Sequence, residues 1–447
     1  IIGTGLFFGV GVGSSYSGNA SILAWIILSI VAIYISTYFA ELVSMYPKAG
    51  GTYGYSKHAY NRFFSFLMGW ISWLLGNLTT ALLVVAAIDY LIPDPSYFWL
   101  KIGISIALIV LLNAVAYFGI EVSAFLLVVF VIVSISVLLS IIFPGIFQVN
   151  SQNYFPFFTF GVSSIFVTIF FLAESFFGWE SATYLAEETQ EPEKIIPKAI
   201  IIGTIVVGIL GTSVAVVSLG VIPWKILAAS NAPLSIVAEY DFGHIGMTLI
   251  NFGIFIALIG SAAGGIITMP RLILALARDK LFIAQLSGIH EKFKTPYKAI
   301  IFQTVVSLLV FGMVFGRYKA LLTLLLPLGF VMYLFVILSV PILRNKEPGI
   351  KRKFKVPFAT FGSFILITFI ILTIFAWISS DSNAINTLKL GFSLILVGIP
   401  IYLLLEIYYN PETVIKISDA IAYLSLLTER IILPKKIRQE ILALLGD

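Results

Sequence analysis

Cysteine is absent from this 447-residue sequence, and charged residues make up only 11% of it. Without cysteine the chain cannot form disulfides, bind zinc through thiolates or use a thiol as a nucleophile. The three histidines, His58, His244 and His290, are scattered and lack the spacing of metal ligands. No Gly-x-x-x-x-Gly-Lys-Ser/Thr stretch occurs, which argues against ATP hydrolysis. We therefore expect a protein that is not an enzyme, with no catalytic residues, no metal site and no resident cofactor.

Hydrophobic residues, by contrast, make up 60% of the chain, and the mean hydropathy is +1.05. Such values are typical of a polytopic membrane protein and not of a soluble protein of this size. We predict an all-α fold of about 12 transmembrane helices, which occupy residues 1–408 with the start of the first helix missing from the sequence. Apolar runs long enough to cross a bilayer lie at roughly 1–17, 20–46, 62–92, 98–118, 123–147, 160–186, 199–222, 244–277, 299–316, 320–343, 357–379 and 387–408.

The basic residues indicate how these helices cross the cell membrane. If helix 1 starts on the cytoplasmic side, most lysines and arginines of the loops lie inside, as the positive-inside rule requires. The loop 187–198 departs from this pattern with four glutamates, but acidic residues contribute little to topology. Both termini are then cytoplasmic, and residues 409–447 are predicted to form a tail of amphipathic helices at the cytoplasmic surface. The basic residues that lie outside are Lys101, Lys225, Arg317, Lys319 and Lys389.

Two segments are predicted to interrupt apolar helices. Gly3-Thr4-Gly5 lies in the first run, and Glu174-Ser175-Phe176-Phe177-Gly178 lies in the run 160–186. Glycine is unfavourable in a helix interior, so we expect unwound backbone with unpaired N–H groups at these points. Such backbone persists at membrane depth only where protein buries it or where it lines a cavity, and in secondary transporters broken helices hold the substrate. For Gly-x-Gly alone, close helix packing through small residues is an equally good interpretation.

Four motifs occur in a characteristic order and spacing. The first, Ile1-Ile2-Gly3-Thr4-Gly5-Leu6-Phe7, looks like the first-helix signature of permeases in the amino acid–polyamine–organocation (APC) superfamily. Ala40-Glu41-Leu42 with Pro47-Lys48-Ala49-Gly50-Gly51-Thr52-Tyr53 is similar to its pattern at the end of helix 2. Gly178-Trp179-Glu180-Ser181 with Ala186-Glu187-Glu188-Thr189-Gln190-Glu191-Pro192 resembles helix 6 and its loop, and Pro270-Arg271 with Ala275-Leu276-Ala277-Arg278-Asp279 resembles the end of helix 8. The motifs span residues 1–279, and the rest matches only in hydropathy.

The resemblance implies a five-plus-five inverted repeat followed by two further helices, with helices 1 and 6 as the discontinuous pair. It also implies a secondary active transporter that moves amino acids or related amines, such as polyamines, by alternating access. The carboxylate of an amino acid needs N–H donors, which the amides around Thr4 supply at a positive helix end. Its ammonium needs acceptors, for which the carbonyl groups of Ile1, Ser175 and Phe177 are suitable. Helices 1 and 6 are expected to face each other across one central cavity.

Two glutamates accompany the predicted break in helix 6. A carboxylate at membrane depth costs a few kcal/mol, which makes each a candidate functional residue. Glu180 occupies the superfamily's acidic position, where bonding to loose backbone and proton handling are both open. Glu174 stands where the superfamily usually has an aromatic gate; it either contacts the substrate, which would favour cationic substrates, or faces a water-filled vestibule. The aromatic residues Phe176, Phe177 and Trp179 either take over the gating role or simply pack.

Residues on helices 3, 5 and 8 also have more than one interpretation. Asn77, Ser261, Gly264 and Gly265 either line the site or pack helices together. Ser134 stands where many proton-coupled relatives have a lysine, and residues 122–150 contain no lysine or arginine. Sodium coupling, protons carried by a glutamate and uncoupled exchange therefore remain open.

The expected partners are a small-molecule substrate and the lipid bilayer, without nucleic acid. A transporter-like sensor that signals through a cytoplasmic C-terminal domain is the alternative function, and an intramembrane enzyme is the weakest candidate. The coupling candidates are Glu174, Glu180 and Ser134. The predicted substrate-binding residues are Ile1, Gly3, Thr4, Gly5, Asn77, Glu174, Ser175, Phe176, Phe177, Gly178, Ser261 and Gly265.

Overall fold

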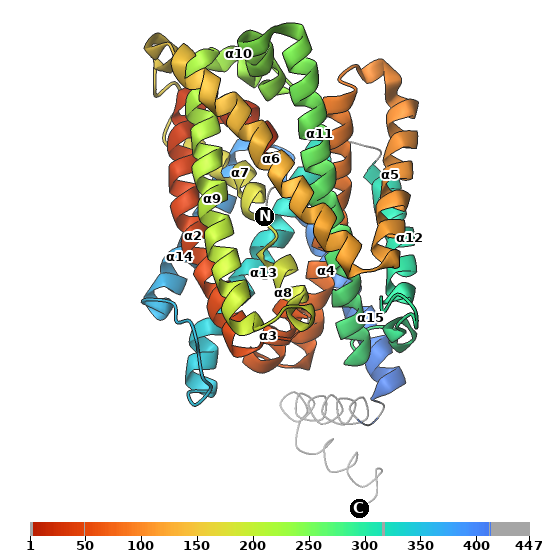
Figure 1. Ribbon diagram of the computed structural model, residues 1–447. Helices are drawn as coiled ribbons and strands as arrows, with labels where there is room; N and C mark the ends of the chain where they lie inside the picture. The colour runs from red at the N-terminus through yellow and green to blue at the C-terminus, as the bar shows by residue number, and fades with distance from the viewer. Residues whose placement is uncertain (1–2, 49, 315–317, 411, 413–447) are drawn as a thin grey trace, which may run out of the picture.

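A computed structural model describes residues 3–48, 50–314, 318–410 and 412, and these residues form helices and connecting turns without any β-strand (Figure 1). Ile1 and nearly all of the predicted tail 409–447 lie outside the described residues. The α-helices are α1 (Gly5–Ser17), α2 (Ser21–Met45), α3 (Gly51–Ala59), α4 (Arg62–Leu91), α5 (Phe98–Phe118), α6 (Ile120–Gln148), α7 (Ser163–Leu172), α8 (Trp179–Tyr184), α9 (Pro192–Val221), α10 (Trp224–Ala228), α11 (Pro233–Arg278), α12 (Tyr297–Val314), α13 (Tyr318–Lys346), α14 (Ala359–Ser380) and α15 (Ala384–Tyr409).

The helices long enough to cross a membrane follow the apolar runs of the sequence. Ten stretches of the described residues qualify by length and hydropathy; the first, Gly5–Met45, contains both α1 and α2, and Tyr297–Gly312 is a shorter apolar helix. When α1 and α2 are counted separately and the shorter helix is included, these stretches match the twelve predicted helices. They confirm a polytopic all-α membrane protein. The apolar run predicted to start at 244 agrees with the structure: α11 extends from Pro233 to Arg278, but non-helical backbone at Gly243 (φ 68°) divides it, and the longer second helix begins at residue 244.

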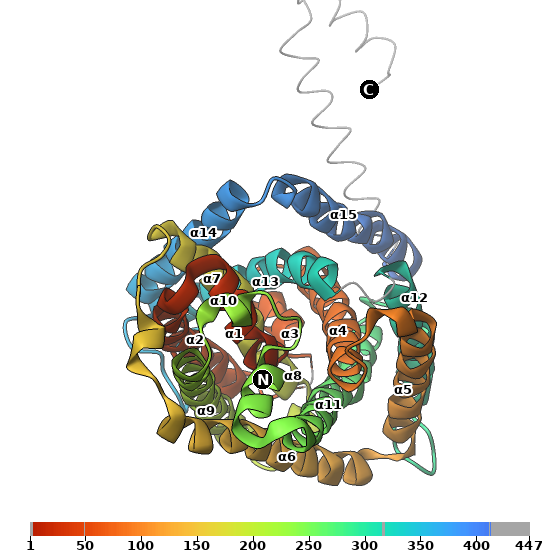
Figure 2. The same ribbon diagram turned by 90° about the horizontal axis from the view of Figure 1, so that it is seen from above.

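The helices of the two halves pair with their counterparts. Helix 1 (α1) packs on the first part of helix 6 (α7), helix 2 (α2) on helix 7 (α9), helix 3 (α4) on helix 8 (α11), and helix 4 (α5) on helix 9 (α12). Contact between equivalent elements is what a pseudo-two-fold relation between the halves produces. The last two helices, α14 and α15, form an arc along one side of the bundle (Figure 2). This arrangement agrees with a five-plus-five repeat followed by two helices.

The outer surface of the bundle is apolar. Large hydrophobic side chains on the peripheral helices are exposed, and they suit hydrocarbon because each helix satisfies its own backbone hydrogen bonds. The interior, by contrast, buries polar side chains at membrane depth, which marks it as the functional region. Representative outward-facing residues are Leu111, Phe143, Phe147, Phe364, Phe375 and Leu404.

Helix 6 is interrupted, as the sequence predicts. The helix α7 ends at Leu172, a 3₁₀ turn covers Ala173–Phe176, Phe177 is extended, and α8 begins at Trp179. Between them Gly178 has a φ of 116°, a left-handed conformation that a residue with a Cβ adopts only with strain. The two halves, α7 and α8, therefore lie one above the other on either side of irregular backbone (Figure 1). We refer to residues 173–178 as the break.

Candidate functional site

The start of α1 binds a carboxylate that belongs to the break. Oε1 of Glu174 accepts a hydrogen bond from the backbone N–H of Thr4 at 3.2 Å. Its Oε2 accepts one from the backbone N–H of Gly5 at 2.9 Å and another from the Thr4 hydroxyl at 2.8 Å. We call these three groups the α1 donors. The two N–H groups have no hydrogen-bond partner within the helix, because they lie at its N-terminus, which is the positive end of the helix dipole. The site is therefore suited to a negative charge, and Glu174 provides it.

The position of Glu174 bears on one of the two sequence-based interpretations. The residue is only 2% exposed, so in this structure it does not face an open vestibule. Its contact with a substrate stays a prediction. The side chain occupies the amides that were expected to hold the carboxylate of a substrate. It also makes no ion pair with any lysine, arginine or histidine that the structure describes. The charge is therefore held by dipoles, without a positive partner among the described side chains.

Glycine allows the first helix and the break to touch. A Cβ placed on Gly5 would lie 1.8 Å from Oγ of Ser175, and one on Gly3 would lie 2.7 Å from Oε1 of Glu174. The two segments face each other as expected, but at these atoms they are in contact rather than separated by a cavity. The sequence left two alternatives for Gly-x-Gly: close packing through small residues, or helix-end amides without a partner in their own helix. Both occur here, at the same place. Oγ of Ser175 is buried and has no hydrogen-bond partner among the described residues.

Tyr318, at the first turn of α13, is a site residue that the sequence did not reveal. Its hydroxyl lies 2.9 Å from the Thr4 hydroxyl, and its ring stacks on Phe8 with centroids 4.7 Å apart. Its signal in the sequence is weak, since one tyrosine at the start of a leucine-rich helix resembles an ordinary interfacial aromatic residue. In the fold it covers the hydroxyl of Thr4 and completes the hydrogen-bond network around Glu174.

A vestibule of about 500 Å³ lies directly above this network. Tyr318, Phe8 and Phe171 form part of its wall, and it extends past Tyr16 to Ser230, near the end of the bundle where α10 lies (Figure 1). Its polar groups include an ion pair between Lys101 Nζ and Asp89 Oδ1 at 2.8 Å. Glu174 thus lies two hydrogen bonds from the vestibule, through Thr4 and Tyr318. We call this end of the molecule the vestibule face.

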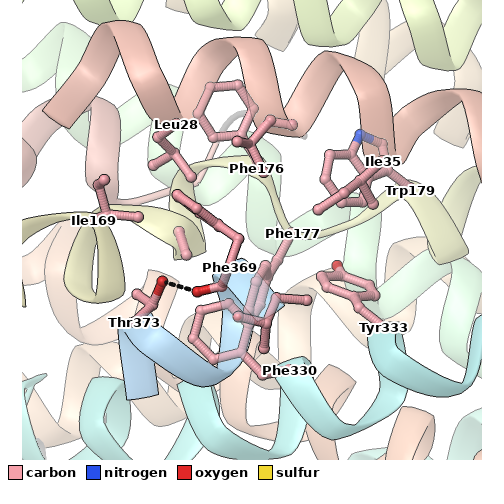
Figure 3. Close-up of a pocket in the computed structure, with 14 residues that line it drawn as sticks. Leu28, Ile35, Ile169, Phe176, Phe177, Trp179, Phe330, Tyr333, Phe369 and Thr373 are labelled. Carbon is pink, nitrogen blue, oxygen red and sulfur yellow. Dashed lines mark hydrogen bonds between the residues drawn. The ribbon is translucent and has the colours of Figure 1, made fainter. Parts of the chain in front are cut away.

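The aromatic residues of the break line a different cavity. Phe176, Phe177 and Trp179 point, together with Phe330 and Tyr333, into an apolar pocket of about 20 Å³ between the break, α2, α13 and α14 (Figure 3). That volume is near the size of one water molecule, but its lining is almost wholly apolar, so it does not suit a polar ligand. In this structure these rings pack behind the break. The sequence had left packing and gating open for them.

Glu180, the second carboxylate, lies on the far side of the break. Its Oε2 accepts a hydrogen bond from the hydroxyl of Tyr333 at 3.1 Å, and its side chain is 7% exposed. The ring of Tyr333 in turn packs against Phe177, with centroids 4.9 Å apart. Glu180 therefore connects α8 to α13 below the break, and it does not share the α1 donors with Glu174.

The predicted residues outside helices 1 and 6 make no contact with the α1 donors among the described residues. Oδ1 of Asn77 accepts from Gln303 Nε2 at 2.8 Å and from the Ser307 hydroxyl at 3.1 Å, so Asn77 joins α4 to α12. The hydroxyls of Ser261 and Ser134 donate to carbonyl groups one turn earlier in their own helices. The two glycines of helix 8 pack against neighbouring helices: a Cβ on Gly265 would lie 3.2 Å from Thr80 Oγ1, and one on Gly264 would meet only Leu127.

Ion pairs close the opposite end of the bundle, which we call the sealed face. The fully buried carboxylate of Glu41 receives Arg344 through two hydrogen bonds of 2.9 and 2.6 Å, and Nε of Arg352 lies 3.5 Å from it. Lys57 Nζ lies 2.8 Å from Asp279 Oδ2, next to α3. Within the described part of the chain, no three His, Cys, Asp or Glu residues come together in a group that would hold a metal ion.

Comparison with known proteins agrees with this architecture. The chain is similar to the branched-chain amino acid permease BcaP of Bacillus subtilis, at 26% identity over 386 residues that make up 80% of each chain. It is 26% identical to the serine/threonine exchanger SteT of the same organism, over 90% of this chain and 92% of the relative. The human cystine/glutamate transporter is 28% identical over 91% of this chain and 83% of its own length.

The family comparison covers nearly all of the transmembrane region. A family model described as amino acid permease matches residues 1–404, which include both the α1 donors and the break. The relatives are transporters and not enzymes, in agreement with the lack of a catalytic arrangement in the sequence. The chain is therefore a member of the amino acid permease family, within the APC superfamily.

Proposed function

We propose that this permease is a secondary active transporter that moves amino acids or related amines by alternating access between the vestibule face and the sealed face. The observation that supports the proposal most directly is the buried carboxylate of Glu174 on the α1 donors, at the foot of a vestibule. Helix-end amides beside a broken helix are where secondary transporters bind their substrates. The relatives named above carry amino acids of several kinds, which agrees with a permease but does not choose a substrate.

We propose that the vestibule face is extracellular. Lys57, Arg62 and Arg344 lie on elements of the sealed face, whereas Lys101 and Lys319 line the vestibule. The loops that carry most of the basic residues are cytoplasmic in membrane proteins. The N-terminal side of helix 1 and the chain after α15 then lie in the cytoplasm.

We further propose that Glu174 favours substrates with a positive charge, such as arginine, lysine or ornithine. A cation 4 Å from a carboxylate gains about 1 kcal/mol in bulk water and roughly 4 kcal/mol at an effective dielectric constant of 20. Glu174 is buried and lacks a described positive partner, so a substrate cation would supply the missing charge. Exchange of a proton on Glu174 for that cation would couple transport to a pH gradient without a lysine on helix 5. Sodium coupling would require another site.

Uptake into proteoliposomes tests the function. The panel comprises the proteinogenic amino acids and common polyamines, each measured with and without sodium and pH gradients. We expect uptake of cationic substrates that depends on the pH gradient and is unchanged by sodium. Glu174→Gln is expected to weaken the binding of cationic substrates selectively and to flatten its pH dependence. If this variant handles neutral and cationic substrates as the parent does at both pH 5 and pH 8, Glu174 has no role in selectivity or coupling.

A further inference from the structure

The α1 donors are already satisfied in this structure by a carboxylate of the protein itself. Thr4 N, Gly5 N and the Thr4 hydroxyl all donate to Glu174. An α-amino acid brings its own carboxylate, which would need the same three donors. Two carboxylates cannot both be bound there, because each of the three donors has a single hydrogen and that hydrogen is already donated to Glu174. An amino acid must therefore either displace Glu174 or bind without the α1 donors.

An amine without a carboxylate meets no such conflict. A carboxylate has about four acceptor positions, and three of those on Glu174 are occupied, two on Oε2 and one on Oε1. One acceptor position on Oε1 remains. A primary ammonium group would occupy it and would also supply the positive charge that the described surroundings of Glu174 lack. The occupied α1 donors then help the amine, because they hold the carboxylate in place.

A second group beside the same contact is ready to accept an N–H bond. The hydroxyl of Ser175 is buried, has no partner among the described residues, and lies within van der Waals reach of Gly5. Hydroxyl oxygens accept as well as donate, and a buried hydroxyl without a partner costs about 1–3 kcal/mol. An ammonium group bound to Oε1 of Glu174 has further N–H bonds to give, and the hydroxyl of Ser175, the next residue of the break, has an unused acceptor.

We propose that Glu174 is a built-in substitute for the substrate carboxylate, so that the site selects primary amines without an α-carboxylate over the corresponding amino acids. This proposal rests on the function proposed above and makes Glu174 the residue that determines specificity. Removal of the Glu174 carboxylate would free the α1 donors for an external carboxylate. The same substitution is therefore expected to weaken the binding of amines and to strengthen the binding of amino acids.

The test compares ligands that differ in the carboxylate but not in net charge. Lysine and 5-amino-1-pentanol each carry one net positive charge at pH 7, and only lysine has a carboxylate. Binding of each to the purified full chain is measured by competition and by uptake into proteoliposomes, with 1,5-diaminopentane as a third ligand. For the parent protein we expect the two amines to bind at least about tenfold more tightly than lysine, a ratio that corresponds to ~1.4 kcal/mol.

Three variants complete the design. Glu174→Ala frees the α1 donors and is expected to reverse the order, so that lysine binds more tightly than 5-amino-1-pentanol. Glu174→Gln keeps one acceptor oxygen near the donors. It is expected to lose the preference for amines without a gain in affinity for lysine. Asp241→Asn is the matched control, since both carboxylate oxygens of Asp241 are buried without a described partner but lie elsewhere, on α11. It is expected to leave the ratio unchanged.

The outcomes separate this proposal from the proposed function. Uptake of lysine with an affinity equal to or better than that of 5-amino-1-pentanol in the parent overturns the role of Glu174 and leaves the transporter intact. A ratio that falls equally in Asp241→Asn also overturns it, because general loss of negative charge would then explain the effect. Uptake of no amino acid and no amine contradicts the proposed function itself. If Glu174→Ala does not fold, the parent ratio and Glu174→Gln still decide.

Discussion

The two ends of the bundle hold their helices together by different means. At the vestibule face, a space of about 500 Å³ is lined by residues of α1, α4, α5, α7, α10 and α13, and the described ion pair along it is Asp89–Lys101. At the sealed face, Glu41, Asp279 and Glu406 each bind a basic side chain from a distant part of the sequence. Tyr318 and the α1 donors lie between the two regions.

This difference indicates which contacts must change during transport. The vestibule reaches the network around Glu174 with only Tyr318 in between, so opening on that side requires little rearrangement. If transport proceeds by the proposed alternating access, opening on the other side has two routes. It either separates the buried Glu41 from Arg344 and Arg352, which is costly, or moves these groups together with their ion pairs intact.

The largest expected effect lies at the boundary between the two regions. Gly5→Leu places a side chain where even a Cβ would lie 1.8 Å from Oγ of Ser175. We expect uptake to fall below detection, because the helix 1 start and the break could no longer touch. Gly103→Leu is the matched control, since its added side chain meets no atom within 4 Å and faces outward from α5. Normal uptake by a well-expressed Gly5→Leu protein would show that the substrate binds elsewhere.

The sealed face is tested through Glu41. Glu41→Gln leaves Arg344 and Arg352 without their carboxylate, and breaking a buried ion pair in this way typically costs about 3–5 kcal/mol. We expect a large drop in the thermal unfolding temperature of the purified protein. Glu193→Gln, which removes an ion pair with the exposed Lys353, is expected to change stability by at most about 1 kcal/mol. Equal stability of the two variants would show that the sealed face is not held by Glu41.

Single cysteines distinguish the two faces directly, because the 447-residue sequence contains none. Ser15 is exposed and lines the vestibule, whereas Ser56 on α3 is buried. We expect Ser15→Cys to react quickly with a membrane-impermeant thiol reagent added outside, and Ser56→Cys to react slowly from either side. Comparable rates from the outside would mean that the vestibule face is not the open end. Addition of a transported substrate is expected to increase the rate at Ser56→Cys from the cytoplasmic side.

The sequence predicted the helices well because lipid imposes a simple rule on them. Each helix must be long, apolar and complete in its backbone hydrogen bonds, so hydropathy alone located twelve. Glycine and a run of polar and aromatic residues also located the break, since left-handed backbone at Gly178 is a local property.

The partners of Glu174 could not be predicted in the same way. The prediction that Glu174 is functional rests on its depth in the membrane. Its contact with the α1 donors depends on how helices 1 and 6 are rotated, and hydropathy does not encode rotation. The same holds for Asn77, which could line a site or join α4 to α12 until its contact with Gln303 was visible. Tyr318 was missed because its partner, Thr4, is more than 300 residues away.

The smallest expected effect concerns Tyr318, which separates the vestibule from the network around Glu174. Tyr318→Phe keeps the ring that stacks on Phe8 but removes the hydroxyl that lies 2.9 Å from the Thr4 hydroxyl. Because one hydrogen bond contributes about 0.5–1.5 kcal/mol, we expect substrate affinity to change about two- to tenfold. Thr4→Val removes the other hydroxyl at nearly constant shape, and the double variant measures the coupling between the two residues. Tyr408→Phe, on the exposed surface of α15, is the control for loss of a tyrosine hydroxyl. If the two single changes add without coupling, Tyr318 covers Thr4 by position alone, and its ring rather than its hydroxyl closes the vestibule.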